Sequence, residues 1–177
     1  RYIEVPRWTA RQQLDEEKLA LGFYFSGHPF HTVQSEIGRF VRQPLAKLEP
    51  RKEPQFLAGL VVGVRTKLTG RGKMAFIQLD DGSKSVEVSV FSELLDSDRA
   101  KIREDEVLIV EGRVQPDDFA GEGKVRIVAE RLLTLAEARG RFARQLRLSV
   151  DGQVSDDRSA AQRLRSLLAP YTPGECP

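Results

Sequence analysis

The stretch GKMAFIQLDDGSKSVEVSVF, residues 72–91, decides the fold, because it contains two alternating apolar runs joined by an Asp-Gly turn. Alternation with a period of two predicts two half-buried strands that pair as a β-hairpin. Ala75, Ile77 and Leu79 are expected to face a core, which leaves the ring of Phe76 on the solvent side. That ring is either packing material or a surface on which a flat molecule stacks.

Three more apolar segments continue this pattern on either side of the hairpin. Residues 56–68 are rich in β-branched side chains and interrupted by two glycines, which suits a strand that coils sharply. Residues 107–115 and 124–135 predict the fourth and fifth strands, and residues 92–102 predict a short helix. Five strands with a helix between the third and the fourth is the order of an OB-fold barrel, which we assign to residues 56–135.

The regions on both sides of the barrel contain predicted helices. Residues 1–50 predict a helical lead-in, with one helix over about 9–21 and a second over about 31–41. Residues 141–177 predict a strand and then a helix over about 156–169, which close no core by themselves and indicate an incomplete domain. The predicted fold class is mainly β with flanking helices (α+β): a five-stranded OB-fold barrel, a helical N-terminal lead-in and a truncated C-terminal α/β segment.

Alternation along each strand predicts which side chains fill the barrel and which lie outside it. The side chains expected inside are, in strand order, Ala58, Leu60, Val62, Val64; Ala75, Ile77, Leu79; Val86, Val88, Val90; Leu108, Val110, Val114; and Val125, Ile127. The outer side of the first three strands is then a polar sheet that carries one aromatic ring.

Basic side chains are expected around this ring. A base that stacks on an exposed ring contributes about 1–3 kcal/mol, and basic loops follow the phosphates. The candidate nucleic-acid-binding residues are Arg65, Lys67, Arg71, Lys73, Phe76, Lys84, Arg113, Lys124 and Arg126. Residues 56–135 carry 12 basic and 14 acidic side chains, and Glu87 lies beside the ring, so the sequence predicts only weak binding of single-stranded DNA. Stacking and packing of Phe76 stay open alternatives.

The sequence offers no set of residues for catalysis, metal binding or a cofactor. One cysteine with His28 and His31 falls short of the four ligands of a closed zinc site, and His28 is expected to be a structural turn residue. No nucleophile–base set or carboxylate pair is found. No apolar run approaches the roughly 18 residues that cross a bilayer, and no signal peptide is apparent, so we expect a cytoplasmic location without membrane contact.

Four segments carry a resemblance to a known family, and their order is its specific part. They are EEKLALGFYFSGHPF (16–30), AGLVVGVRTKLTGRGKMAFIQLDDGSKSVEVSVF (58–91), LIVEGRVQPDDFAGEGKVRIVAE (108–130) and LLTLAEARGRFARQLRLSV (132–150). Together they resemble the C-terminal part of the alpha subunit of bacterial DNA polymerase III. The resemblance implies an accessory OB-fold module of a DNA-directed DNA polymerase, one that contacts single-stranded template DNA during chromosome replication.

The resemblance also implies what surrounds the barrel. Residues 1–50 would continue from the fingers and clamp-binding region, and residues 141–177 would begin the domain that binds the clamp-loader tau subunit. The sliding clamp and the tau subunit are therefore expected partners of neighbouring regions of the parent protein. The family's catalytic aspartates lie far upstream, and the Mg²⁺ of the parent polymerase is expected there.

Two other functions stay open at the level of the sequence. One is a protein-interaction scaffold within the replisome, whose outer face docks a neighbouring domain. The other is a tRNA anticodon-binding OB domain, because the hairpin is similar to that of class II aminoacyl-tRNA synthetases. In that family a ring at the position of Phe76 stacks on an anticodon base, while a Gln often stands where this chain has Glu87.

We expect the purified chain to have no polymerase activity, since nothing in it matches the family's metal-binding carboxylates. The measurement is extension of a labelled primer on a template in the presence of Mg²⁺ and all four deoxynucleotides, with an intact replicative polymerase as the positive control. Extension that persists after contaminating polymerase has been removed would contradict this expectation.

Overall fold

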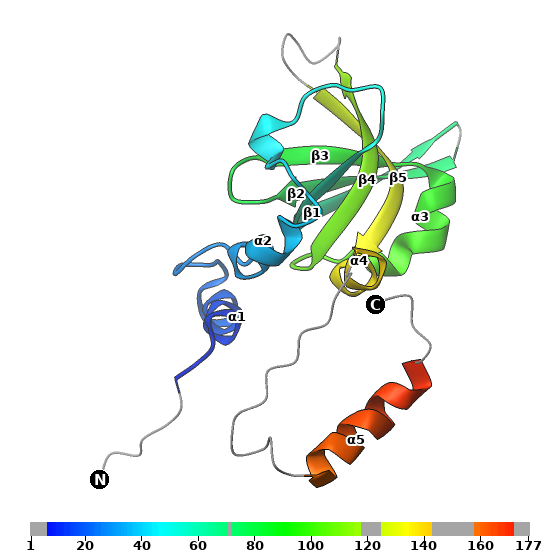
Figure 1. Ribbon diagram of the computed structural model, residues 1–177. Helices are drawn as coiled ribbons and strands as arrows, with labels where there is room; N and C mark the ends of the chain where they lie inside the picture. The colour runs from blue at the N-terminus through cyan, green and yellow to red at the C-terminus, as the bar shows by residue number, and fades with distance from the viewer. Residues whose placement is uncertain (1–6, 71, 118–124, 143–157, 172–177) are drawn as a thin grey trace. The chain divides into compact units, whose positions relative to one another are not determined.

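Five strands close into a barrel in the order β1-β2-β3-β5-β4, which can be followed in Figure 1. All neighbouring pairs are antiparallel except β3 and β5, which are parallel. The elements are β1 (Gln55–Thr69), β2 (Gly72–Asp80), β3 (Ser85–Val90), α3 (Ser92–Asp98), β4 (Val107–Pro116) and β5 (Val125–Thr134). The five-stranded OB-fold barrel and the position of its helix are confirmed.

The computed structural model describes residues 7–70, 72–117, 125–142 and 158–171. The chain divides into two units, Arg1–Glu137 and Ala138–Pro177. Within the described residues, no helix is long and apolar enough to cross a membrane.

The barrel interior is filled by apolar side chains from all five strands. The positions predicted to face inward on β2, β3, β4 and β5 do so, which follows from the regular alternation of these strands. The core consists of Leu57, Val61, Ala75, Ile77, Leu79, Val86, Val88, Val90, Leu108, Val110, Val114, Ile127, Ala129 and Leu132, with Leu95 of α3 and Leu45 of η1 (Leu45–Lys47). Each large aliphatic side chain buried in this way contributes about 1.5–3 kcal/mol.

The prediction for the first half of β1 was wrong, and the reason is a β-bulge. The register of β1 against β2 shifts between Val61 and Gly63, so side chains before the bulge alternate in the opposite phase to those after it. Val61 therefore faces the core, and Val62 is 47% exposed. Val64, after the bulge, packs against the core as predicted. Two other residues that were expected inside are buried outside the core cluster: Ala58 and Leu60.

Gly59 allows β1 to pass close to the end of β2. A Cβ atom at this position would lie 3.0 Å from the backbone nitrogen and 3.0 Å from the backbone oxygen of Asp80, a separation that forces the backbone to shift. The glycines of this segment predicted a sharply coiled strand, and the close approach at Gly59 gives the physical reason for one of them.

The lead-in contains two helices before the linker to the barrel. Helix α1 (Ala10–Leu21) begins at Thr9, which forms a capping box, and ends at Gly22, whose φ of 81° only glycine adopts freely. Helix α2 (His31–Ile37) ends four residues before its predicted end. Gly38 follows it directly, and glycine disfavours continuation of a helix.

The last described segments are helical. Helix α5 (Arg158–Leu168) confirms the helix predicted near the end of the chain, and the strand predicted before it lies outside the described residues. Helix α4 (Leu135–Phe142) was missed. Its signal is the sequence Thr-x-x-Glu, because Thr134 and Glu137 exchange side-chain and backbone hydrogen bonds as a capping box does.

Asp81 fastens the lead-in to the turn between β2 and β3. Its carboxylate accepts a hydrogen bond of 2.8 Å from the backbone N–H of Leu45 and bonds from the N–H groups of Ser83 and Lys84 and the Ser83 hydroxyl. Burial alone would raise the pKa of this carboxyl, but the hydrogen bonds from Ser83, Leu45 and Lys84 outweigh it and hold the pKa below the ordinary 3.8. The charged form is therefore the stabilising one.

We expect Asp81→Ala to lower the free energy of unfolding by about 1–3 kcal/mol, because the buried N–H of Leu45 loses its acceptor. Asp81→Asn, which keeps one acceptor oxygen, is the matched control and should cost less. Since the pKa is depressed in the folded state, the stabilisation is complete above pH 3.8 and is lost as the pH falls through the lower folded-state value. Urea unfolding between pH 7 and about pH 2 measures both effects. A constant difference between wild type and Asp81→Ala over that range would contradict the assignment.

Candidate nucleic-acid interface

The outer side of β1, β2 and β3 brings five side chains into two adjoining rows. Strand pairing places Arg65 opposite Phe76 and Phe76 opposite Ser89, and in the next row it places Gln78 opposite Glu87. Residues opposite each other on paired strands share a face, so these five lie on one side of the sheet. We call this surface the platform.

The ring of Phe76 is half-buried and has a cation beside it. The guanidinium carbon of Arg65 lies 5.7 Å from the centre of the Phe76 ring, within the range of a cation–π interaction. The same guanidinium donates a hydrogen bond to the carboxylate of Glu87 and forms an ion pair with it. Arg65 therefore covers the platform and is itself neutralised there.

The candidate residues of the loop between β1 and β2 have a different environment. Lys67 and Lys73 are exposed at the end of the hairpin. Lys67 pairs with Met74 on the same face as Arg65 and Phe76, whereas Lys73 pairs with Leu68 on the opposite face. Their charge is available to a phosphate without the loss of a buried contact. Arg71 lies outside the described residues.

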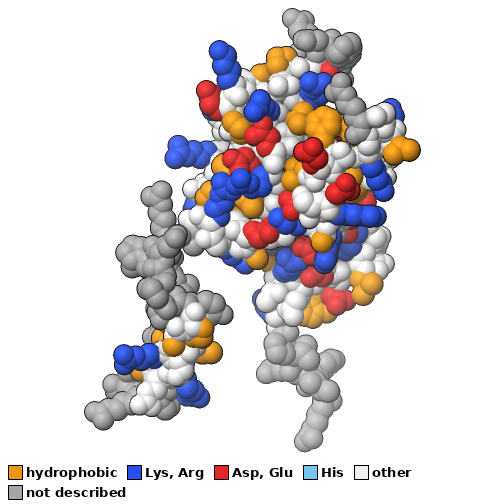
Figure 2. All heavy atoms as spheres, turned by 90° about the vertical axis from the view of Figure 1, so that its right-hand side faces the viewer, with side chains coloured by type: hydrophobic (Ala, Val, Ile, Leu, Met, Phe, Trp, Pro, Cys, Tyr) orange, Lys and Arg blue, Asp and Glu red, His pale blue; other side chains and the backbone are white. Residues whose placement is uncertain are grey.

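The remaining candidates are spread over the barrel. Lys84 is exposed in the turn after β2, Arg113 is paired with Glu130, and Arg126 donates a hydrogen bond to the side chain of Gln115. Lys124 lies outside the described residues. In Figure 2 basic and acidic side chains alternate over the face shown, which agrees with the nearly balanced charge of the barrel sequence. The structure thus brings Arg65, Lys67 and Phe76 onto one face, places Lys73 at the same hairpin end but on the other face of β2, and leaves Arg113 and Arg126 on β4 and β5.

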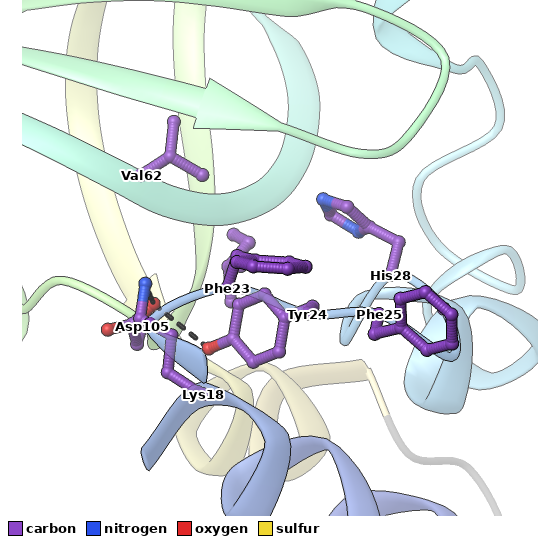
Figure 3. A pocket seen from close by; sticks show the side chains of 10 residues that line it. Lys18, Phe23, Tyr24, Phe25, His28, Val62 and Asp105 are labelled. Atoms are coloured by element: carbon purple, nitrogen blue, oxygen red, sulfur yellow. Dashed lines mark hydrogen bonds and ion pairs between the residues drawn. The ribbon is translucent and has the colours of Figure 1, made fainter. Parts of the chain in front are cut away.

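Sequence reasoning missed a pocket formed where the lead-in meets the barrel. It has a volume of about 470 Å³ and is shown in Figure 3. Its lining residues are Lys18, Gly22, Phe23, Tyr24, Phe25, Gly27, His28, Leu60, Val62 and Asp105. The sequence feature that could have indicated the pocket is the run of three adjacent aromatic residues, Phe23 to Phe25, because three adjacent side chains cannot all face one core.

Asp105 holds one side of this pocket. The hydroxyl of Tyr24 donates a hydrogen bond of 2.9 Å to its carboxylate, and the ammonium of Lys18 lies 3.5 Å from the same oxygen (Figure 3). Burial and the adjacent carboxylate of Asp105 raise the pKa of Tyr24 to about 12, so the hydroxyl remains a donor at neutral pH. Asp105 has a φ of 63°, which aspartate tolerates better than most residues.

Glu17 fixes the other end of the aromatic run. Its carboxylate accepts hydrogen bonds from the hydroxyl and backbone N–H of Ser26 and from the backbone N–H of Phe25. These hydrogen bonds lower the pKa of Glu17 to about 2, and the bond from the Ser26 hydroxyl has the largest effect. The aromatic loop is therefore held by charged hydrogen bonds on both sides.

His28 lies in a structural turn, as predicted. Its Nδ1 accepts a hydrogen bond of 3.3 Å from the backbone N–H of Phe30, and its Nε2 lies 3.4 Å from the carboxylate of Asp80. Burial lowers the pKa of His28, and Asp80 opposes that effect in part. Among the described residues, no group of three or more His, Cys, Asp and Glu side chains could hold a metal ion.

The chain matches an OB-fold family model and the alpha subunits of bacterial DNA polymerase III. Residues 56–135 match the family model described as OB-fold nucleic acid binding domain. The chain is 41% identical over 150 residues to DNA polymerase III subunit alpha of Neisseria meningitidis serogroup A, which covers 85% of this chain and 13% of that protein. It is 34% identical over 180 residues to DNA polymerase III subunit alpha of Escherichia coli K12, which covers 99% of this chain and 15% of that protein.

Solved structures with some likeness cover about half of the chain. A domain of replication protein A from Methanococcus maripaludis is 17% identical with a TM-score of 0.42, over 52% of this chain and 93% of that one. The second single-stranded DNA binding protein (SSBb) of Mycobacterium smegmatis is 13% identical with a TM-score of 0.43, over 56% of this chain and 99% of that one.

We expect Tyr24→Phe to lower the free energy of unfolding by about 0.5–1.5 kcal/mol, because Asp105 loses a donor while the ring keeps its packing. Amide exchange of the lead-in should accelerate more than that of β2, since the hydrogen bond joins the lead-in to the barrel. Lys18→Gln is the comparison variant, because it removes the second contact to the same carboxylate. Equal stability of Tyr24→Phe and wild type in urea would show that Asp105 is not an anchor.

Proposed function

The chain is homologous to a segment of the alpha subunits of bacterial DNA polymerase III, and we propose that it is an accessory OB-fold module of such a subunit that contacts single-stranded template DNA. The chain spans 13–15% of the length of these relatives. Polymerisation, with its Mg²⁺, is proposed for other parts of the parent protein. The sliding clamp and the clamp-loader tau subunit are proposed partners of neighbouring regions.

One observation carries the contact with single-stranded DNA. The ring of Phe76 lies on the outer face of β2, and exposed Lys67 follows on the same face. Exposed Lys73 lies at the same hairpin end, on the other face of β2. Proteins that bind single strands usually combine an aromatic ring on which a base stacks with basic side chains that pair with phosphates. Phe76 is half-buried, so part of the ring remains accessible to a base.

The same geometry predicts that the contact is weak. Arg65 lies over the ring and is paired with Glu87, so a strand displaces an existing interaction before a base can stack. Two exposed ammonium groups make few phosphate contacts. Each contact adds only about 0.7 to the magnitude of the slope of the logarithm of the binding constant against the logarithm of the salt concentration. Duplex DNA offers no splayed base to the ring and should bind less well.

A protein-interaction scaffold is the second candidate, and one observation favours it. Phe23 and Phe25 are 56% and 77% exposed at the pocket, which is unusual for large aromatic side chains. An exposed apolar group of this kind is typical of a surface that another protein covers. Recognition of a tRNA anticodon is not proposed, because the curated relatives named above are polymerase subunits.

We expect the chain to bind single-stranded DNA with micromolar or weaker affinity and Phe76→Ala to reduce that binding by about 1–3 kcal/mol. Lys67→Ala combined with Lys73→Ala should weaken binding equally for every base sequence, because phosphates carry no base information. The measurement is a fluorescence-anisotropy titration at several salt concentrations.

The control variant is Arg99→Ala, which removes an exposed charge from η2 (Arg99–Lys101) instead of the outer face of the first three strands. It should bind like wild type. If wild type, Phe76→Ala and the double lysine variant bind alike, or if none binds at low salt, the scaffold function replaces this one and Phe76 is packing.

A further inference from the structure

The guanidinium of Arg65 makes two contacts at once on the platform. It lies 5.7 Å from the centre of the Phe76 ring, and it donates to the carboxylate of Glu87 on the neighbouring strand. The side chain of Arg65 is 74% exposed and that of Glu87 is 42% exposed, so both contacts form at the surface, where a ligand can replace them. A base that stacks on Phe76 has to displace the cation from the ring.

Displacement of Arg65 leaves the Glu87 carboxylate without its donor. A carboxylate accepts two parallel hydrogen bonds, and the planar fork of a guanidinium is the group that supplies them best. The replacement ligand therefore has to offer a flat π system for the ring and adjacent N–H donors for the carboxylate. This requirement distinguishes the four bases.

Guanine meets both requirements. Its Watson–Crick edge carries N1–H and the N2 amino group side by side, which repeats the donor pattern of a guanidinium on an aromatic plane. Thymine presents two carbonyl oxygens on that edge with one N–H between them. Cytosine and adenine each present one amino group beside a ring nitrogen that accepts. Only guanine among the four supplies two neighbouring donors and no acceptor between them.

The other groups of the platform agree with this assignment. The amide nitrogen of Gln78 donates a hydrogen bond of 2.7 Å to the hydroxyl of Ser85, so this side chain is held away from the carboxylate that it faces across the strands. Arg65 donates to Glu87, so the carboxylate acts as an acceptor on this face. Met74 and Lys67 form the row on the other side of Phe76, where no carboxylate acceptor stands.

We propose that Phe76 and Glu87 form a nucleobase site selective for guanine in single-stranded DNA, closed in the free protein by the guanidinium of Arg65. The inference rests on the proposed contact with single-stranded DNA and adds a base preference to it. Arg65, once displaced, is free to pair with a phosphate of the same strand. The site gives an otherwise sequence-independent contact a preference at one nucleotide.

The test compares strands of about 12 nucleotides, within the site size of an OB fold. One strand is thymine only, and the others carry isolated guanine, inosine or cytosine in the same thymine tract. Inosine lacks the N2 amino group and is otherwise guanine-like, so it removes one donor of the pair. The probe is the labelled strand, and the protein is the whole 177-residue chain. We expect the guanine strand to bind about tenfold tighter than the inosine, cytosine and thymine strands, the discrimination typical of one bidentate contact.

Three variants separate the role of Glu87 from general charge effects. Glu87→Gln should abolish the difference between guanine and inosine, because a carboxamide offers one acceptor and one donor. Glu130→Gln removes the same charge from a similar Arg–Glu pair, Arg113 with Glu130, across β4 and β5, and should leave the ranking of the four strands unchanged. Arg65→Gln should keep the preference for guanine, because the acceptor and the ring remain.

The outcomes distinguish this inference from the proposed function. Measurable and equal binding of all four strands by wild type overturns the guanine site and leaves the contact with single-stranded DNA intact. A preference for guanine that survives in Glu87→Gln overturns the role of the carboxylate. Absence of binding to every strand at low salt overturns the guanine site together with the proposed function.

Discussion

The closure of the barrel depends on one long strand that belongs to two parts of the sheet. β1 pairs with β4 over Gln55–Leu60 and with β2 over Leu60–Thr69, so Leu60 is paired on both sides. A strand can serve both neighbours only if it bends, and the bulge at Val61–Gly63 and the close approach at Gly59 provide that bend. Loss of the bend would open the barrel and separate the halves of its core.

The bend also decides what the outer face carries. By inverting the alternation of β1, the bulge turns Arg65 to the same side as Phe76 and brings its guanidinium to Glu87 of β3. The platform is thus a product of strand pairing among three strands. Arg65 and Glu87 balance each other's charge on the platform, and the half-buried ring of Phe76 lies there on a barrel whose sequence contains slightly more acidic than basic side chains.

The lead-in is joined to the barrel through charged hydrogen bonds as well as packing. Asp81 accepts from the backbone of Leu45, and Asp105 accepts from Tyr24 near Lys18. Both carboxylates lie in loops of the barrel, whereas their donors come from residues 1–50. The contact of Asp81 holds the linker before β1 against the turn between β2 and β3, and the contact of Asp105 with Tyr24 positions the aromatic loop of the pocket.

The sequence by itself determined the barrel, because the alternation in β2 and β3 and the Asp-Gly turn between them are local and regular. It also located Phe76 on the outer face and the basic loop beside it. Only the tertiary structure decided which side chains of the first half of β1 face the core, since the position of a bulge cannot be read from the alternation of apolar residues. The partnership of Arg65 with Phe76 and Glu87 is likewise tertiary, because its three members come from different strands and their distances follow from register alone.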